Sequence, residues 1–123
     1  MSAGSSQSLA IDVDNMLYAW GADSSGQLGN YGNTSRSFIK LGAFPLVQNS
    51  PIQIGTSSWK QASAGVEHTA AIRSDDLLFI WGTNTNGKLG DGTNESRSSP
   101  VQLGTSSWTA ISAGAQHTVG ITK

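Results

Sequence analysis

Cysteine is absent from this chain of 123 residues, and charged residues make up only 12% of it. Without cysteine the chain cannot form disulfide bonds, thiolate nucleophiles or zinc sites that depend on sulfur. Seven basic residues are scattered singly among eight acidic ones, so no basic stripe is available to neutralise nucleic-acid phosphates. No apolar run approaches the roughly 20 residues that a membrane-spanning helix needs. The composition therefore argues against nucleic acid and membrane as partners, and it leaves the cellular compartment open.

What the chain has instead is an internal repeat. Gly-Thr-Ser-Ser-Trp at 55–59 recurs at 104–108, and Trp-Gly at 20–21 recurs at 81–82. The tripeptide Ser-Ala-Gly occurs three times, at 2–4, 63–65 and 112–114. Each copy of such a repeat is a unit that cannot bury its own apolar face, so it must stack on its neighbours.

The spacing of the tryptophans sets the length of the unit. Trp59 and Trp108 are 49 residues apart, whereas Trp20 and Trp81 are 61 apart, so the first copy carries 12 extra residues. We assign these to an insertion at 38–49. The chain then divides, within a single repeat domain, into a first unit at 2–62, a second at 63–111 and the start of a third at 112–123.

Short apolar runs separated by turn residues predict β-hairpins. One hairpin turns at Asp14-Asn15 and the next at 74–76, where Asp76 tolerates positive φ less well than asparagine. Further strands are expected at 51–54 and 100–103, each beginning with a proline, and at 59–63 and 108–112, each beginning with a tryptophan. No segment shows a 3.6-residue period. Four short strands per 49 residues is typical of a β-propeller blade. We expect an all-β protein, with blades of four antiparallel strands and almost no helix.

Two blades and part of a third cannot close a propeller, because an open arc leaves apolar faces and strand edges exposed. If the four strands of a blade are lettered A to D, the chain reads BCD, ABCD, AB. A head-to-tail contact between copies of the chain would complete a blade across each junction, with one surplus strand B to displace. Three copies, giving about six or seven blades, are favoured over four.

Two long motifs carry a family resemblance. They read Ser-Ala-Gly-Val-Glu-His-Thr at 63–69 and, after a hairpin, Trp-Gly-Thr-Asn-Thr-Asn-Gly-Lys-Leu-Gly-Asp-Gly-Thr at 81–93. This pattern resembles the repeat of the regulator of chromosome condensation family. The first copy departs from it, with Gln7-Ser8 in place of His-Thr and a looser end at 30–34. The resemblance implies a propeller, typically of seven blades, whose face loops bind other proteins.

The aromatic and histidine positions follow the repeat, which favours a structural role. We expect them to pack between blades, and they are Trp20, Trp59, Trp81, Trp108, His68 and His117. The sequence offers no catalytic, cofactor-binding or metal-binding residues. The glycine-rich stretch at 82–88 is followed by Leu89 where a phosphate-binding loop needs Ser or Thr. Met16 likewise stands where a calcium loop needs an oxygen ligand after Asp12 and Asp14.

The insertion is the most apolar stretch of the chain. It is either a longer loop folded over its own blade or a contact with a partner or another subunit. As candidates for an interface it offers Phe38, Ile39, Leu41, Phe44, Pro45 and Leu46.

These features predict a non-enzymatic structural or protein-interaction module that needs no cofactor and binds copies of itself and another protein. A virion or surface component is one form this could take. The alternatives are guanine-nucleotide exchange on a small GTPase, the activity that gives the family its name, and an enzyme inhibitor whose propeller plugs an active site.

Overall fold

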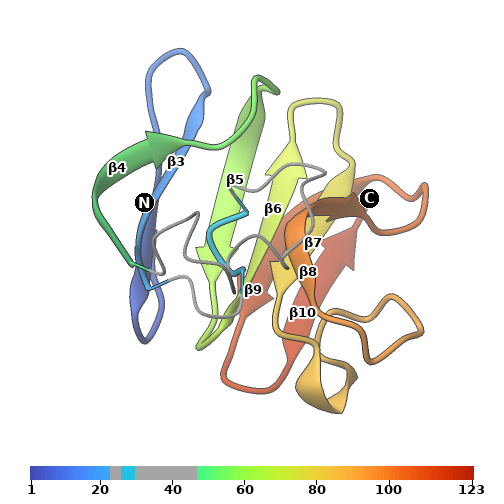
Figure 1. Ribbon diagram of the computed structural model, residues 1–123. Helices are drawn as coiled ribbons and strands as arrows, with labels where there is room; N and C mark the ends of the chain where they lie inside the picture. The colour runs from blue at the N-terminus through green and yellow to red at the C-terminus, as the bar shows by residue number, and fades with distance from the viewer. Residues whose placement is uncertain (23–25, 30–46) are drawn as a thin grey trace.

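The computed structural model describes residues 1–22, 26–29 and 47–123, which form three stacked antiparallel sheets (Figure 1). The first sheet has the order β1-β2-β3-β4, made of β1 (Ser2–Ala3), β2 (Gln7–Ile11), β3 (Leu17–Ala22) and β4 (Val47–Gln53). The second has the order β5-β6-β7-β8, made of β5 (Trp59–Ala64), β6 (His68–Arg73), β7 (Leu78–Gly82) and β8 (Arg97–Gln102). The third pairs β9 (Trp108–Ala113) with β10 (Thr118–Thr122).

The prediction of an all-β protein with four-stranded antiparallel blades is confirmed. In the described ranges the only helical element is the short 3-10 turn η1 (Thr85–Gly87), and no helix there is long and apolar enough to cross a membrane. Both hairpin turns use positive φ as expected, at Asn15 (φ 65°) and Asp76 (φ 72°). In the first, Asp12 Oδ1 accepts backbone N–H bonds from Asp14 and Met16, which fixes the turn.

The sheets are offset from the predicted repeat units by one strand. Trp59 opens the second sheet rather than closing the first, because β5 pairs with β6. The expectation that the first blade lacks strand A is wrong: Ser2 and Ala3 pair with Leu9 and Ser8. The reason is that the first Ser-Ala-Gly preserves the last residues of a strand A, as Ser63 and Ala64 end β5. This remnant, β1, is two residues long, whereas β9 has six.

Strand pairing also refines where the extra residues of the first copy lie. Gln48 lies opposite Gly21, and Arg97 lies opposite Gly82. The 49-residue spacing therefore already holds at Gln48, and the extra residues end before it. The six interface candidates of the insertion, Phe38, Ile39, Leu41, Phe44, Pro45 and Leu46, lie outside the described residues.

The core lies between the sheets. One cluster of buried side chains joins the first and second sheets around Leu9, Leu17, Trp59 and Trp81. The other joins the second and third sheets around residues such as Ile72. Because β6 is covered on both faces, its first five residues are all buried, and the strand lacks the alternation of a half-exposed one.

Candidate functional site

Three kinds of hydrogen bond between successive sheets recur at equivalent residues in the two interfaces, and they are the most specific feature of the molecule. At the inner ends of the A strands, the Ala64 N–H donates to Ser2 Oγ at 3.0 Å. One sheet further, the Ala113 N–H donates to Ser63 Oγ, also at 3.0 Å. The serines of successive Ser-Ala-Gly tripeptides therefore form a series of hydrogen bonds, the serine ladder, that links each blade to the next.

A second repeated bond uses the threonine after the histidine position. Thr69 Oγ1 donates to the carbonyl of Gln27 at 2.7 Å, and Thr118 Oγ1 donates to the carbonyl of Lys88 at 3.0 Å. Both carbonyls belong to the Gly-x-Leu-Gly loop of the preceding blade. A third repeated bond joins backbones at the opposite ends of the strands, where the Trp108 N–H donates to the carbonyl of Asp76 at 2.9 Å.

His68 is fully buried between the second and third sheets. Its Nε2 lies 2.8 Å from Thr118 Oγ1. Because the Thr118 hydroxyl gives its proton to Lys88, the imidazole must donate from Nε2, which leaves Nδ1 unprotonated. Burial, helped by the nearby charge of Lys88, lowers the pKa of His68 to about 4. The ring is therefore a neutral structural donor at neutral pH.

Gln7 occupies the same place between the first and second sheets. Its Nε2 donates to the carbonyls of Gly65 and His68, both at 3.1 Å. The substitution that departs from the family pattern therefore keeps a donor directed across the interface. The glycine beside it is required by close approach, because a Cβ at Gly4 would lie 2.0 Å from the carbonyl oxygen of Gly65.

Trp81 occupies a fitted seat in the first interface. It is fully buried, and a Cβ built at Gly29 would lie 2.5 Å from its Nε1, so only glycine fits beneath the indole. Trp59 packs edge-on against Phe79 with ring centroids 5.5 Å apart, and its centroid lies 6.0 Å from that of Trp81. Strand β7 of the second blade thus contributes two aromatic rings to the first interface, where a pocket of about 410 Å³ remains beside Gly29, Ile54, Trp59 and Phe79.

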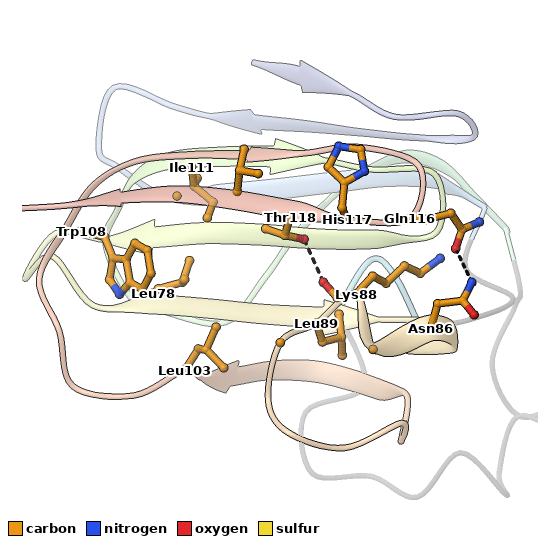
Figure 2. Close-up of a pocket in the computed structure, with 14 residues that line it drawn as sticks. Leu78, Asn86, Lys88, Leu89, Leu103, Trp108, Ile111, Gln116, His117 and Thr118 are labelled. Atoms are coloured by element: carbon orange, nitrogen blue, oxygen red, sulfur yellow. Dashed lines mark hydrogen bonds between the residues drawn. The ribbon is translucent and has the colours of Figure 1, made fainter.

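The second interface has an open pocket of about 320 Å³ at the equivalent place, and no described ring of a following blade lines it (Figure 2). Its walls are the loop after β7, with Leu89 and Gly90, and the residues Leu103 and Trp108. These are the repeat equivalents of Leu28, Gly29, Ile54 and Trp59, which surround the aromatic rings of the first interface. The third sheet has β9 and β10 but no partner for β10 beyond β9 among the described residues, so no third-blade ring lies in the pocket.

The far side of the third sheet is exposed. Val119 and Ile121 are 58% and 63% exposed, although their equivalents in the second blade, Ala70 and Ile72, are fully buried. His117 is exposed as well, whereas His68 is not. The groups that bind the next blade are therefore present on β10 with nothing against them in the described part of the chain.

The loop between β7 and β8 is held by one buried amide. Asn84 Nδ2 donates to Asp91 Oδ1 at 3.1 Å and to the carbonyl of Thr93 at 2.8 Å, while its Oδ1 accepts from the Leu89 N–H. Burial opposes ionisation of Asp91, but bonds from Thr93, Asn84 and Arg97 outweigh it and hold the pKa of that carboxyl below its usual value. This network explains the glycine-rich stretch at 82–88 as a structural loop.

The structure distributes the expected packing residues unequally. Trp59, Trp81 and His68 lie buried between sheets, whereas Trp20 and Trp108 are half-buried. Sequence reasoning missed the bonds of Thr69, Thr118 and Gln7, although the repetition of His-Thr 49 residues apart was the available signal. In residues 1–22, 26–29 and 47–123 no group of three or more His, Asp or Glu side chains could hold a metal ion.

Stacked four-stranded antiparallel sheets joined by repeated contacts define the blades of a β-propeller. A model of the Regulator of chromosome condensation (RCC1) repeat matches residues 14–72 and 75–121, and a second RCC1 repeat model matches 59–88. The chain therefore belongs to the RCC1 repeat family, as its motifs predicted. Propellers of this family are generally protein-interaction or exchange-factor domains.

Comparison with known proteins places the chain as a fraction of larger relatives. The Ultraviolet-B receptor UVR8 of Arabidopsis thaliana is 33% identical over 99 residues, which cover 79% of this chain and 20% of the receptor. The human Probable E3 ubiquitin-protein ligase HERC6 is 35% identical over 95 residues, covering 75% of this chain and 8% of the ligase. A crystal structure of Prp20p from Saccharomyces cerevisiae matches with a TM-score of 0.83 and 18% identity, over 99% of this chain and 30% of that one. The chain thus spans a fifth or less of these two curated relatives.

Proposed function

We propose that this chain is a non-enzymatic protein-interaction module that works as part of a propeller, with copies of itself supplying the missing blades head to tail. Three copies, giving about six blades, fall within the usual range for propellers. The partner-binding surface is then the set of loops on the faces of the completed ring. The observation that carries the proposal is the exposed face of the third sheet, with Val119 and Ile121 at 58% and 63% exposure.

The exposure of side chains on β10 supports association of this kind. The exposed side chains His117, Val119 and Ile121 stand where the second blade buries His68, Ala70 and Ile72. A free sheet edge with apolar side chains at its surface favours pairing with another chain. Because the two ends of the chain differ, the contact is heterologous and can close into a ring.

Static light scattering on the purified chain, over a hundredfold range of concentration, tests the self-association. The expected result is a discrete particle of several chains, with three favoured. A stable and folded monomer of 12.8 kDa at every concentration would contradict the proposal.

Partner binding is tested separately on the assembled particle. One relative, from Canis lupus familiaris, is named X-linked retinitis pigmentosa GTPase regulator and is 33% identical over 87 residues, which cover 71% of this chain and 8% of that protein. A nucleotide-release assay with a small GTPase therefore belongs beside a binding assay. Accelerated release would replace the interaction module by the exchange-factor alternative, while binding without release supports the module.

A further inference from the structure

The pocket of the second interface and the aromatic face of the first blade are complementary halves of one contact. In the first interface, Trp81 lies against Gly29, and Phe79 lies against Trp59. In the pocket, Gly90 and Trp108 stand in the places of Gly29 and Trp59, and the two rings are missing.

The chain carries matching rings elsewhere, on β3. Trp20 and Tyr18 are the equivalents of Trp81 and Phe79, and they lie opposite Ser8 and Ala10 in the same register in which Trp81 and Phe79 lie opposite Thr69 and Ala71. Because Leu17 and Ala19 point into the core shared with the second sheet, strand alternation directs Tyr18 and Trp20 to the opposite face. That face turns away from all the other blades of its own chain.

We propose that this pocket is the seat for Trp20 and Tyr18 of a second copy, whose β3 pairs with the free edge of β10 and completes the third blade. In this arrangement β9–β10 of one copy replaces β1–β2 of the next. The inference rests on the head-to-tail association proposed above, and it names the strand that is displaced.

Strand β10 is a chemical match for the strand that it replaces. His117, Thr118, Val119, Gly120 and Ile121 stand in the positions of Gln7, Ser8, Leu9, Ala10 and Ile11. Val119 and Ile121 would then enter the core now built by Leu9, and His117 would face Thr69 as His68 faces Thr118. The displaced pair includes β1, which has two residues, while β9 brings a full strand of six. Exchange of equivalent elements between copies is an accessible route to assembly.

Simple stacking of a second copy onto the third sheet does not solve the same problem. The seat of Trp81 is the Gly-x-Leu-Gly loop that follows strand C of the preceding blade. Among the described residues no such loop follows β10, so stacking on them alone would leave Trp20 without a site and the pocket without a ring. Strand exchange gives Trp20 a packing site and fills the pocket with a ring in the same contact.

Two engineered cysteine pairs distinguish the arrangements, and the absence of native cysteine makes the readout clean. Ala19 lies opposite Leu9 in its own chain, whereas after exchange it lies opposite Val119 of the neighbouring copy. Under mild oxidation, the Ala19→Cys/Val119→Cys variant is expected to form disulfide-linked multimers on a non-reducing gel. The Leu9→Cys/Ala19→Cys variant is expected to stay unlinked in the assembled particle.

If light scattering shows assembly but only the Leu9→Cys/Ala19→Cys variant forms a disulfide, within one chain, the exchange is wrong and the proposed function survives. If both double-cysteine variants are monomeric by light scattering, the proposed self-association is wrong. Linked multimers from the Ala19→Cys/Val119→Cys variant in a particle of several chains support the exchange.

Complementation tests the seat itself. Trp20→Ala removes the ring that enters the pocket and leaves the pocket intact. Leu103→Arg places a charge in the pocket and leaves the Trp20 ring intact. Each variant alone is expected to lose association at least tenfold, and an equimolar mixture is expected to form a two-chain complex through its one intact junction. Leu103→Ile, which copies the equivalent Ile54, and Val13→Ala in an exposed turn serve as controls with wild-type association. Unchanged association in Trp20→Ala, or no recovery on mixing two folded variants, would overturn the proposal.

Discussion

Trp81 and Trp20 hold the same place in successive blades, yet one is fully buried and the other is half-buried. The difference comes from what each faces. Trp81 lies over a loop of the preceding blade, whereas Trp20 lies on the face of β3 that is opposite the core shared with the second sheet. The same side chain therefore serves as core in one interface and as surface in the other, and a blade becomes stable through its neighbour.

The largest expected effect comes from removing the buried ring of Trp81. Trp81→Ala is expected to lower the free energy of unfolding by about 3–5 kcal/mol, the usual cost of a Trp-sized cavity in a core. Trp20→Ala, measured on the monomer, is expected to cost no more than about 2 kcal/mol, because less apolar area leaves the core. Urea denaturation of both variants at low protein concentration gives the two values. Equal losses would mean that Trp20 stabilises the folded monomer as much as Trp81 does, contrary to the difference in their burial.

Acid should weaken the second interface through His68. The folded pKa of about 4 lies below the ordinary value of 6.5, because burial and Lys88 oppose the charged ring. Between pH 6.5 and 4 the imidazole of His68 binds a proton in the unfolded chain but not in the folded one. The free energy of unfolding is therefore highest above pH 6.5 and decreases as the pH falls, by roughly 3 kcal/mol at most.

The matched control for that titration is His68→Gln, which copies the Gln7 of the first interface. Urea midpoints at pH 7.0, 5.5 and 4.5 should fall in the wild type and change less in the variant. Asp91 and Asp76 have lowered pKa values, so the stability that they contribute starts to fall at about pH 5 and is lost mainly below 3.8, which leaves the upper part of this window to His68. Parallel pH profiles for the two proteins would exclude His68 as the titrating group.

Repetition in the sequence predicted most of the fold. The 49-residue spacing and the apolar runs were enough for strands, hairpins and blades, since each copy repeats the same local pattern. The two-residue strand β1 was missed because no apolar run marks it; its pairing depends on the rest of the first sheet. The end of the insertion was misplaced because Arg36-Ser37 and Gln48-Asn49 can both be aligned with Arg97-Ser98, and only strand register decides between them.

The interface was harder to predict than the fold. Tryptophan and histidine positions were recognised from their spacing, but the pocket was not, because it depends on how the second and third sheets stack and no sequence motif marks it. The bonds of Thr69 and Thr118 reach loop carbonyls 42 and 30 residues away in sequence, which only the stacking of the sheets brings into contact.

A matched pair of glycine substitutions sharpens the difference between the two interfaces. Gly29 and Gly90 have nearly the same φ, 76° and 73°, so alanine strains the backbone by about 1–2 kcal/mol at either position. A Cβ at Gly29 would also lie 2.5 Å from Trp81 Nε1, whereas at Gly90 the nearest atom is Leu103 Cδ2 at 3.8 Å. Gly29→Ala is therefore expected to cost about 1–3 kcal/mol more than Gly90→Ala in urea denaturation. A difference of zero would show that Trp81 moves aside without cost.

The smallest expected effect concerns the serine ladder, and it depends on assembly. Ser63→Ala removes the acceptor of the Ala113 N–H and should cost about 1 kcal/mol. Ser112→Ala, at the next rung, should cost less than about 0.5 kcal/mol in the monomer, because Ser112 is exposed there. If β9 of one copy replaces β1 of the next, Ser112 takes the place of Ser2 and accepts the Ala64 N–H of that copy. Its substitution should then weaken association severalfold while the unfolding of the monomer stays unchanged. Light scattering and urea denaturation of the same Ser112→Ala preparation separate the two effects, and a variant that assembles like the wild type would remove this rung from the junction.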